Sequence, residues 1–292
     1  MSRIRSGIMY FTDLFFRTRN FTRRRIFGYG VFSNKDSESD SQATFYVQAV
    51  SKINRVPRQF LRFRRIFDYR EILEHVSFNQ GTAYLQRIEE IDPKHIVEIA
   101  EYLQNDGIGK PFRYRFPLIG KASPTTLRYV SVMAEIKRIF GNNLSGDFVE
   151  IGVGYGGQFL ILDKSFKIKS YSMFDLIPVL NLTEKYLEHF EYFADVKFLA
   201  LDEDFSYEWD LAVSNYAFSE LPKSLQREYI GKVLSRSKRG YLIMNSGLED
   251  LTGRSSGKLT LSELRESLPS FEIIEEIPLT SPDNYIIVWG HK

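Results

Sequence analysis

The residues with the clearest chemical purpose form a glycine-rich run, FVEIGVGYGG, that ends at Gly157. Glycines at a turn between a strand and a helix accept backbone angles closed to other residues, and they let a ligand approach the main chain closely. The helix that follows would offer unpaired N–H groups and the positive end of its dipole, which suit a carboxylate or a phosphate. We therefore predict a ligand site at Gly152, Gly154, Gly156 and Gly157.

The glycine spacing alone leaves two cofactor classes open. Gly152, Gly154 and Gly157 satisfy the dinucleotide fingerprint G-x-G-x-x-G, which predicts NAD binding. Glu150, two residues before Gly152, occupies the acidic position typical of methyltransferases that use S-adenosylmethionine. Asp175 ends the next predicted strand, where a carboxylate can accept hydrogen bonds from ribose hydroxyls, although nicotinamide enzymes use the same contact. The order of the elements, described next, also favours S-adenosylmethionine.

The elements that must position these residues follow an alternating pattern from Asp147 onward. The apolar runs are short and bounded by turns, which is typical of strands covered on both faces by helices. The last two runs are only a few residues apart and must therefore pair antiparallel. The predicted strands are 147–152, 170–175, 196–200, 210–214, 240–245, 271–277 and 284–290, with helices near 158–164, 178–193, 224–235 and 262–268. We predict a doubly wound, mostly parallel seven-stranded α/β sheet, the Rossmann-like arrangement of class I methyltransferases.

The chain before Asp147 has a different character. Residues 1–44 are predicted to form a basic, aromatic arm that ends in a polar, flexible loop from Ser33 to Thr44. Residues 45–144 are predicted to form a mostly helical accessory region that caps the domain at 145–292. The pairs Asp92-Pro93 and Ser123-Pro124 are typical helix starts, because a capping side chain precedes a proline at the first helical position.

Composition narrows the chemistry further. The chain has no cysteine, which excludes disulfides, thiolate catalysis and Cys-ligated zinc, and its four histidines show no metal-ligand spacing. We expect no metal site. No apolar run reaches eighteen residues and no signal peptide is apparent, so we expect a cytoplasmic protein without a membrane-spanning helix. Residues 1–70 hold fifteen Lys or Arg against five Asp or Glu. We rank three roles for this arm. A solvated or subunit-contacting tail comes first, binding to anionic lipid at the inner face of the membrane second, and binding to nucleic acid last.

Several further segments resemble the sugar O-methyltransferases of bacterial surface-polysaccharide clusters. The resemblance spans roughly residues 110–292 and is carried by 123–128, Glu150 to Gln158, Asp175-Leu176, 214–221, 239–241, Asn245 and 284–289. Val153 departs from the family, which often has glycine there. The resemblance implies a sugar or glycan acceptor (nucleotide-linked, lipid-linked or polymeric) in polysaccharide biosynthesis. It also implies a methyltransferase reaction class, without assigning the catalytic residues.

The candidate catalytic residues follow the fourth and fifth predicted strands. Ligands of open α/β sheets bind beyond the carboxyl ends of the strands, so the loop from Ser214 to Leu221 lies beside the reacting methyl group. A sugar hydroxyl must lose its proton during attack, which requires a general base or a metal. The predicted catalytic residues are Glu220 as the base, Asn215, which with Ser219 would orient the hydroxyl, and Asn245, which ends the fifth predicted strand beside them. Glu220 could instead stabilise the start of the following helix. The further predicted cofactor contacts are Tyr155, Gln158, Leu176, Asp202 and Asn215.

The sequence therefore predicts an S-adenosylmethionine-dependent O-methyltransferase acting on a sugar hydroxyl. A nicotinamide-dependent sugar oxidoreductase is the alternative enzyme, and a catalytically silent cofactor-binding scaffold is the alternative from another class.

Overall fold

The computed structural model describes residues 41–201, 206–245, 257–282 and 284–291, with side chains described from Phe45 onward. The predictions for the basic arm over residues 1–40, and for Asp202 as a cofactor contact, lie outside the described residues. Helix α2 spans Ser41–Arg55. Its first turn therefore covers the end of the segment in which the sequence predicts a flexible loop.

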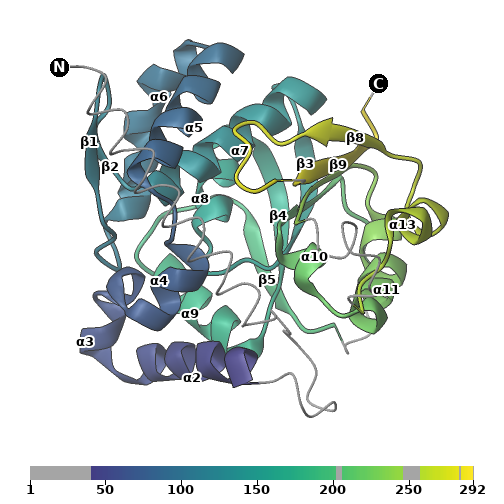
Figure 1. The fold of residues 1–292 in the computed structure, drawn as a ribbon, viewed down its shortest axis with the longest axis horizontal. Helices are drawn as coiled ribbons and strands as arrows, with labels where there is room; N and C mark the ends of the chain where they lie inside the picture. The colour runs from purple at the N-terminus through teal and green to yellow at the C-terminus, as the bar shows by residue number, and fades with distance from the viewer. Residues whose placement is uncertain (1–40, 202–205, 246–256, 283, 292) are drawn as a thin grey trace.

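The centre of the molecule is a seven-stranded sheet (Figure 1). Its strands are β3 (Ser145–Ile151), β4 (Lys167–Phe174), β5 (Asp195–Leu199), β6 (Leu211–Asn215), β7 (Gly240–Met244), β8 (Glu272–Glu275) and β9 (Tyr285–Trp289). They lie in the order β5-β4-β3-β6-β7-β9-β8. Neighbouring strands are parallel, except that β9 runs antiparallel to both β7 and β8. The predicted mostly parallel sheet with a terminal antiparallel pair is confirmed.

Helices cover both faces of the sheet, because successive strand side chains are apolar on both sides. In β3, Phe148 belongs to one buried cluster, whereas Val149 and Ile151 belong to the other. The first cluster includes residues of α7 (Pro124–Phe140), α8 (Gly157–Ser165) and α9 (Ile177–Leu187); the second includes residues of α11 (Lys223–Lys232) and α13 (Leu261–Ser267). The connections therefore wind the chain around the sheet on two sides (Figure 1).

The N-terminal helices share the core of the sheet. They are α3 (Pro57–Phe60), α4 (Phe67–Leu73), α5 (Phe78–Ile91) and α6 (Lys94–Tyr102), with short 3-10 turns η1 (Phe63–Arg65) and η2 (Leu103–Asp106). One continuous buried cluster extends from Tyr46 in α2 to Val288 in β9. The region is thus packed against the sheet and does not form a separate core. It also contains a small hairpin, β1 (Tyr114–Phe116) with β2 (Gly120–Ala122), which the sequence analysis did not predict.

The predicted helix start at Ser123-Pro124 is confirmed, whereas the helix predicted to start at Asp92-Pro93 begins one residue later, at Lys94 with Pro93 as its N-cap. Asp92 accepts a hydrogen bond from the Lys94 N–H (2.9 Å) where α6 begins. Ser123 accepts one from the Thr125 N–H (3.2 Å) at the start of α7, and α7 ends at Gly141, whose φ is 89°. The start of α7 follows the local rule of capping, and sequence alone suffices for it.

Helix α9 is shorter than its sequence pattern indicates. The predicted helix 178–193 ends at Leu187 instead. The carboxylate of Asp163, in α8, accepts hydrogen bonds from the Phe193 and Ala194 N–H groups, both at 2.9 Å. This tertiary contact holds the chain in a non-helical path, and no glycine or proline marks it in the sequence.

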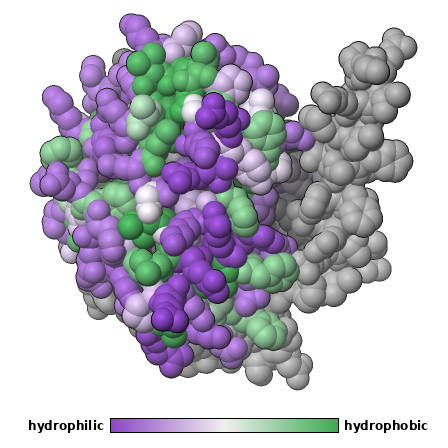
Figure 2. Space-filling view, turned by 90° about the vertical axis from the view of Figure 1, so that its left-hand side faces the viewer, coloured by the Kyte–Doolittle hydropathy of each residue, from purple (hydrophilic) through white to green (hydrophobic). Residues whose placement is uncertain are grey.

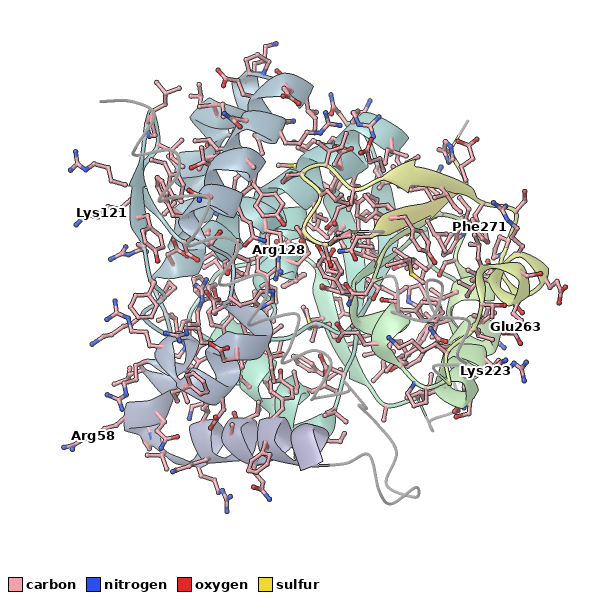
Figure 3. The ribbon with its side chains drawn as sticks, viewed as in Figure 1. Arg58, Lys121, Arg128, Lys223, Glu263 and Phe271 are labelled. Atoms are coloured by element: carbon pink, nitrogen blue, oxygen red, sulfur yellow. The ribbon has the colours of Figure 1, made fainter. Side chains whose placement is uncertain are left out.

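The face formed by the N-terminal helices and the hairpin is mainly hydrophilic, with hydrophobic residues in small separate groups (Figure 2). Arg58 and Lys121 extend outward from this part of the molecule (Figure 3). None of the helices in the described ranges is long and apolar enough to cross a membrane.

Candidate active site at the carboxyl edge of the sheet

The predicted site residues meet at one edge of the sheet. The parallel register pairs Ile151 with Phe174, and it pairs Asn215 with Ile243. The glycine turn after β3, Asp175 after β4 and Asn215 at the end of β6 therefore lie at the same carboxyl edge. Asn245, which follows β7, lies there as well. Open α/β sheets bind ligands at this edge.

The turn after β3 requires glycine for steric and conformational reasons. At Gly152 φ is 81°, and an added Cβ would lie 2.0 Å from the Cβ of Ala217. Gly156 adopts the left-handed conformation with φ of 83° where α8 begins. A side chain at either position would be strained, so the main chain of the turn stays bare.

Asp175 holds this turn in place. Its Oδ2 accepts a hydrogen bond from the Gly154 N–H (3.1 Å), and its Oδ1 accepts one from the Leu176 N–H (2.8 Å). Burial raises the pKa of Asp175 to about 6, although these backbone hydrogen bonds oppose the rise. A carboxylate has lone pairs beyond these two bonds, so ribose hydroxyls remain suitable additional donors. Leu176 is partly buried against the core directly before α9.

Glu150 lies beneath the turn. Its side chain is buried and accepts a hydrogen bond from the hydroxyl of Tyr171 in β4 (2.7 Å). Burial raises the pKa of Glu150 to about 8, against the effect of this hydrogen bond. The described geometry therefore gives Glu150 a place under the glycine turn, and its part in cofactor binding stays a prediction.

Two buried polar atoms at the edge lack a hydrogen-bond partner among the described residues. Asn215 donates through Nδ2 to Gln158 Oε1 (3.2 Å), whereas its Oδ1 is unpaired. Gln158 in turn donates to the main-chain oxygen of Tyr129 (3.2 Å). The Tyr155 hydroxyl is the second unpaired atom. Because unpaired buried polar atoms are costly, both suit a ligand that would complete their bonds.

Glu220 and Asn245 are brought together, whereas Asn215 is held elsewhere. Glu220 ends the short helix α10 (Ala217–Glu220), and its Oε1 accepts from Asn245 Nδ2 at 2.7 Å. The Asn245 N–H donates to the Ser219 hydroxyl (2.9 Å). Of the three predicted catalytic residues, Glu220 and Asn245 are thus in contact, whereas Asn215 contacts Gln158 instead.

Sequence reasoning missed the N-terminal residues that cover the glycine turn. Arg64 is fully buried, and its guanidinium lies 4.7 Å from the centre of the Tyr155 ring. It also pairs with Glu74 at 2.5 Å and with Asp106 at 3.3 Å. Asn105 donates to the main-chain oxygen of Gly157 at 3.1 Å. The cap is therefore tied to the turn by polar contacts as well as by apolar packing.

Several solved structures are similar to parts of this chain. Three similar solved structures are an S-adenosylmethionine-dependent methyltransferase from Clostridium acetobutylicum, phosphoethanolamine N-methyltransferase 2 of Haemonchus contortus with S-adenosyl-L-methionine, and the DhpI complex with SAM and HEP. The identities are 14%, 15% and 13%, and the TM-scores are 0.34, 0.39 and 0.41. The matches cover 40%, 50% and 69% of this chain, and 49%, 38% and 96% of the other chains. No family model and no curated protein matches the chain.

The described sheet has the class I methyltransferase topology. The chain spans about half the length of the Clostridium protein and less of the Haemonchus one. Among the described residues, no group of three or more His, Cys, Asp or Glu side chains could hold a metal ion.

Proposed function

We propose that this chain binds S-adenosylmethionine at the carboxyl edge of the sheet and transfers its methyl group to a sugar hydroxyl. The observation that carries the proposal is the sheet itself, with antiparallel β9 placed between β7 and β8 and a glycine turn after β3. The dinucleotide-binding sheet is mostly parallel with the usual order 3-2-1-4-5-6, whereas here β9 is inserted antiparallel between β7 and β8. The inverted β9 therefore favours the methyltransferase over the oxidoreductase.

The residues at the edge fit the chemistry of this cofactor. The N-terminal end of α8 suits the methionyl carboxylate, and the unpaired Oδ1 of Asn215 suits the methionyl ammonium. Asp175 suits the ribose hydroxyls, because its carboxylate is fixed by the turn that it supports. Tyr155, Gly157 and Gln158 form the wall between these groups and the cap. When bound, the cofactor supplies an electrophilic methyl group on a sulfonium.

Glu220 is proposed as the base that accepts the proton of the acceptor hydroxyl. Asn245 donates a hydrogen bond to this carboxylate at 2.7 Å and so orients it, and a carboxylate can accept a proton from a hydroxyl. Positioning supplies much of the rate, because alignment of the two reactants lowers the barrier by several kcal/mol. The competing role for the pair is structural: it ties α10 to the end of β7.

The choice of a sugar acceptor rests on the sequence resemblance and on the position of the loop from Asn215 to Leu221 after β6. We propose an acceptor that is nucleotide-linked, lipid-linked or polymeric and that belongs to surface polysaccharide. A cytoplasmic location, with the basic arm at the inner face of the membrane, belongs to the same proposal.

Two measurements test the proposal. Isothermal titration calorimetry of the full chain should show micromolar binding of S-adenosylhomocysteine and none of NAD; the opposite pattern supports the oxidoreductase. Mass spectrometry of the surface glycan from cells with and without the gene should then show the loss of one methyl ether. An unchanged glycan, together with intact cofactor binding, supports the silent scaffold.

A further inference from the structure

Arg128, in α7, is a buried cation without an ion-pair partner among the described residues. Its side chain is only 7% exposed, and its Nε has no hydrogen-bond partner. Arg64, the other buried arginine discussed above, is by contrast paired with Glu74 and Asp106. Figure 3 shows Arg128 in the middle of the molecule, between the N-terminal helices and the sheet.

Tyrosines surround the Arg128 guanidinium. It lies 5.3 Å from the centre of the Tyr129 ring and 6.0 Å from the centre of the Tyr216 ring. Burial raises the pKa of Tyr84, in α5, and the positive charge of Arg128 opposes that rise. Neutral hydroxyls and ring faces soften the burial of a cation, but they do not neutralise its charge.

The carboxylate in this neighbourhood is already hydrogen-bonded. Glu276 accepts from the Tyr216 hydroxyl, from the main-chain N–H of Thr280 (3.0 Å) and from Asn284 Nδ2 (3.1 Å). The Thr280 hydroxyl bonds to the same carboxylate at 2.9 Å. Glu276 therefore holds the loop after β8 through these hydrogen bonds, and among the described residues no ion pair joins it to Arg128.

The position of the guanidinium places it beside the proposed acceptor. Tyr216 directly follows Asn215 at the end of β6, in a conformation with φ of 70° that is unusual for a non-glycine residue. The main-chain oxygen of Tyr129 holds Gln158, which contacts Asn215. Arg128 thus borders the segment that follows β6, where the acceptor must meet the methyl group.

We propose that Arg128 binds an anionic group of the acceptor, a phosphate or a carboxylate. A buried charge without a counterion is costly, and an arginine fork matches these oxyanions in geometry as well as in charge. The site therefore takes an acidic or phosphorylated acceptor. This inference rests on the proposed function, because it assumes that methyl transfer occurs at this edge.

The cofactor's own carboxylate is a less suitable partner. The neighbours of Arg128 are Tyr129 of α7, Tyr84 of α5 and Tyr216 after β6. Leu73 of α4 and Arg64 lie against the glycine turn, and the Tyr129 ring lies between Arg128 and Gly157. The methionyl carboxylate is served by the start of α8. Substitution of Arg128 should consequently leave cofactor affinity unchanged.

The experiment titrates inorganic phosphate, and separately acetate, into the full chain saturated with S-adenosylhomocysteine. The wild type should bind at least one of the two anions saturably. Arg128→Met should weaken that binding roughly ten- to hundredfold, the effect of losing a hydrogen bond to a charged group. Arg128→Lys keeps the charge and loses the forked donor geometry, so its anion affinity should lie between those of wild type and Arg128→Met. Arg62→Met removes an exposed cation of the same type and should change nothing.

Distinct outcomes separate the two proposals. Failure of the wild type to bind S-adenosylhomocysteine overturns the proposed function. Two results overturn the role of Arg128 alone, provided that S-adenosylhomocysteine binds normally. One is equal anion affinity in wild type and Arg128→Lys, and the other is no anion binding by either protein. Weakened S-adenosylhomocysteine binding in Arg128→Met or Arg128→Lys also overturns it, because the guanidinium would then hold the methionyl carboxylate. The lysine variant keeps the test decisive if the methionine variant does not fold.

Discussion

Replacement of Glu150 by glutamine should make the protein less sensitive to rising pH. Glu150 is buried in β3 beside Tyr171, and burial raises its pKa to about 8 from an ordinary value of 4.5. The folded state therefore prefers the neutral acid, whereas the unfolded chain releases the proton at lower pH. Stability that is present below pH 4.5 is lost as the pH rises toward 8. Glutamine cannot ionise and avoids this loss.

The magnitude follows from proton linkage. Between the unfolded and folded pKa values, each pH unit costs the wild type about 1.4 kcal/mol of unfolding free energy. From pH 5 to pH 7 the loss is roughly 2.5 kcal/mol, because part of the unfolded carboxyl is still protonated at pH 5. The amide introduced by Glu150→Gln also has donors that the acid lacks, so the slopes with pH are compared and not the absolute stabilities.

Urea unfolding followed by circular dichroism at pH 5, 6 and 7 measures these slopes. The difference between Glu150→Gln and wild type should grow with pH in favour of the variant. Tyr171→Phe is the matched control: it removes the hydrogen bond that lowers the pKa of Glu150, so it should retain the pH dependence. Parallel curves for Glu150→Gln and wild type would refute the assignment of a neutral, buried Glu150.

Three further predictions concern the site and its cap. Asp175→Ala should weaken S-adenosylhomocysteine binding roughly ten- to hundredfold in calorimetry, and wild-type affinity should fall as the pH drops through about 6 because the carboxylate becomes protonated; an unchanged dissociation constant would contradict both. Glu220→Gln should lower kcat about 10²- to 10⁴-fold at constant cofactor affinity, whereas normal turnover with a lower melting temperature would assign the residue a structural role. Arg64→Met should lower the unfolding free energy by about 3–5 kcal/mol, because Glu74 and Asp106 would be left buried and unpaired; a loss below about 1 kcal/mol would show that these carboxylates find other partners.

The sheet and the glycine turn could be predicted because their signals are local. Short apolar runs between turns specify buried strands, and three glycines at fixed spacing specify the turn after β3. Asp175 follows from its position at the end of β4. Each of these signals lies within about ten residues of sequence, which is the range over which backbone sterics and alternation operate.

The cap and the anion site could not be predicted in the same way. Arg64 lies in a basic, aromatic stretch and resembles a solvated charge, but Asp106 and Ser123, two of its partners, are 42 and 59 residues away. Arg128 lies within a segment that the sequence resemblance includes, yet its burial depends on α5, β6 and the loop after β8. Only tertiary packing distinguishes such buried arginines from surface ones.

The early end of α9 has the same origin. The helix ends at Leu187, and Asp163 then binds the N–H groups of Phe193 and Ala194 farther along the chain. The pairing of Glu220 with Asn245, rather than with Asn215, likewise depends on how α10 crosses the ends of β6 and β7. These outcomes reflect tertiary override of local propensity.

The central claim is that the turn after β3 binds S-adenosylmethionine, and calorimetry on one matched pair of variants tests it most directly. Gly154 has φ of 58° and a bare main chain within the turn, whereas a Cβ on Gly231 in α11 would meet nothing within 4 Å. Wild type and Gly231→Val should bind S-adenosylhomocysteine with micromolar affinity, and Gly154→Val should not bind it while keeping its circular dichroism spectrum. Undiminished binding by a folded Gly154→Val, or no binding by the wild type, would contradict the account.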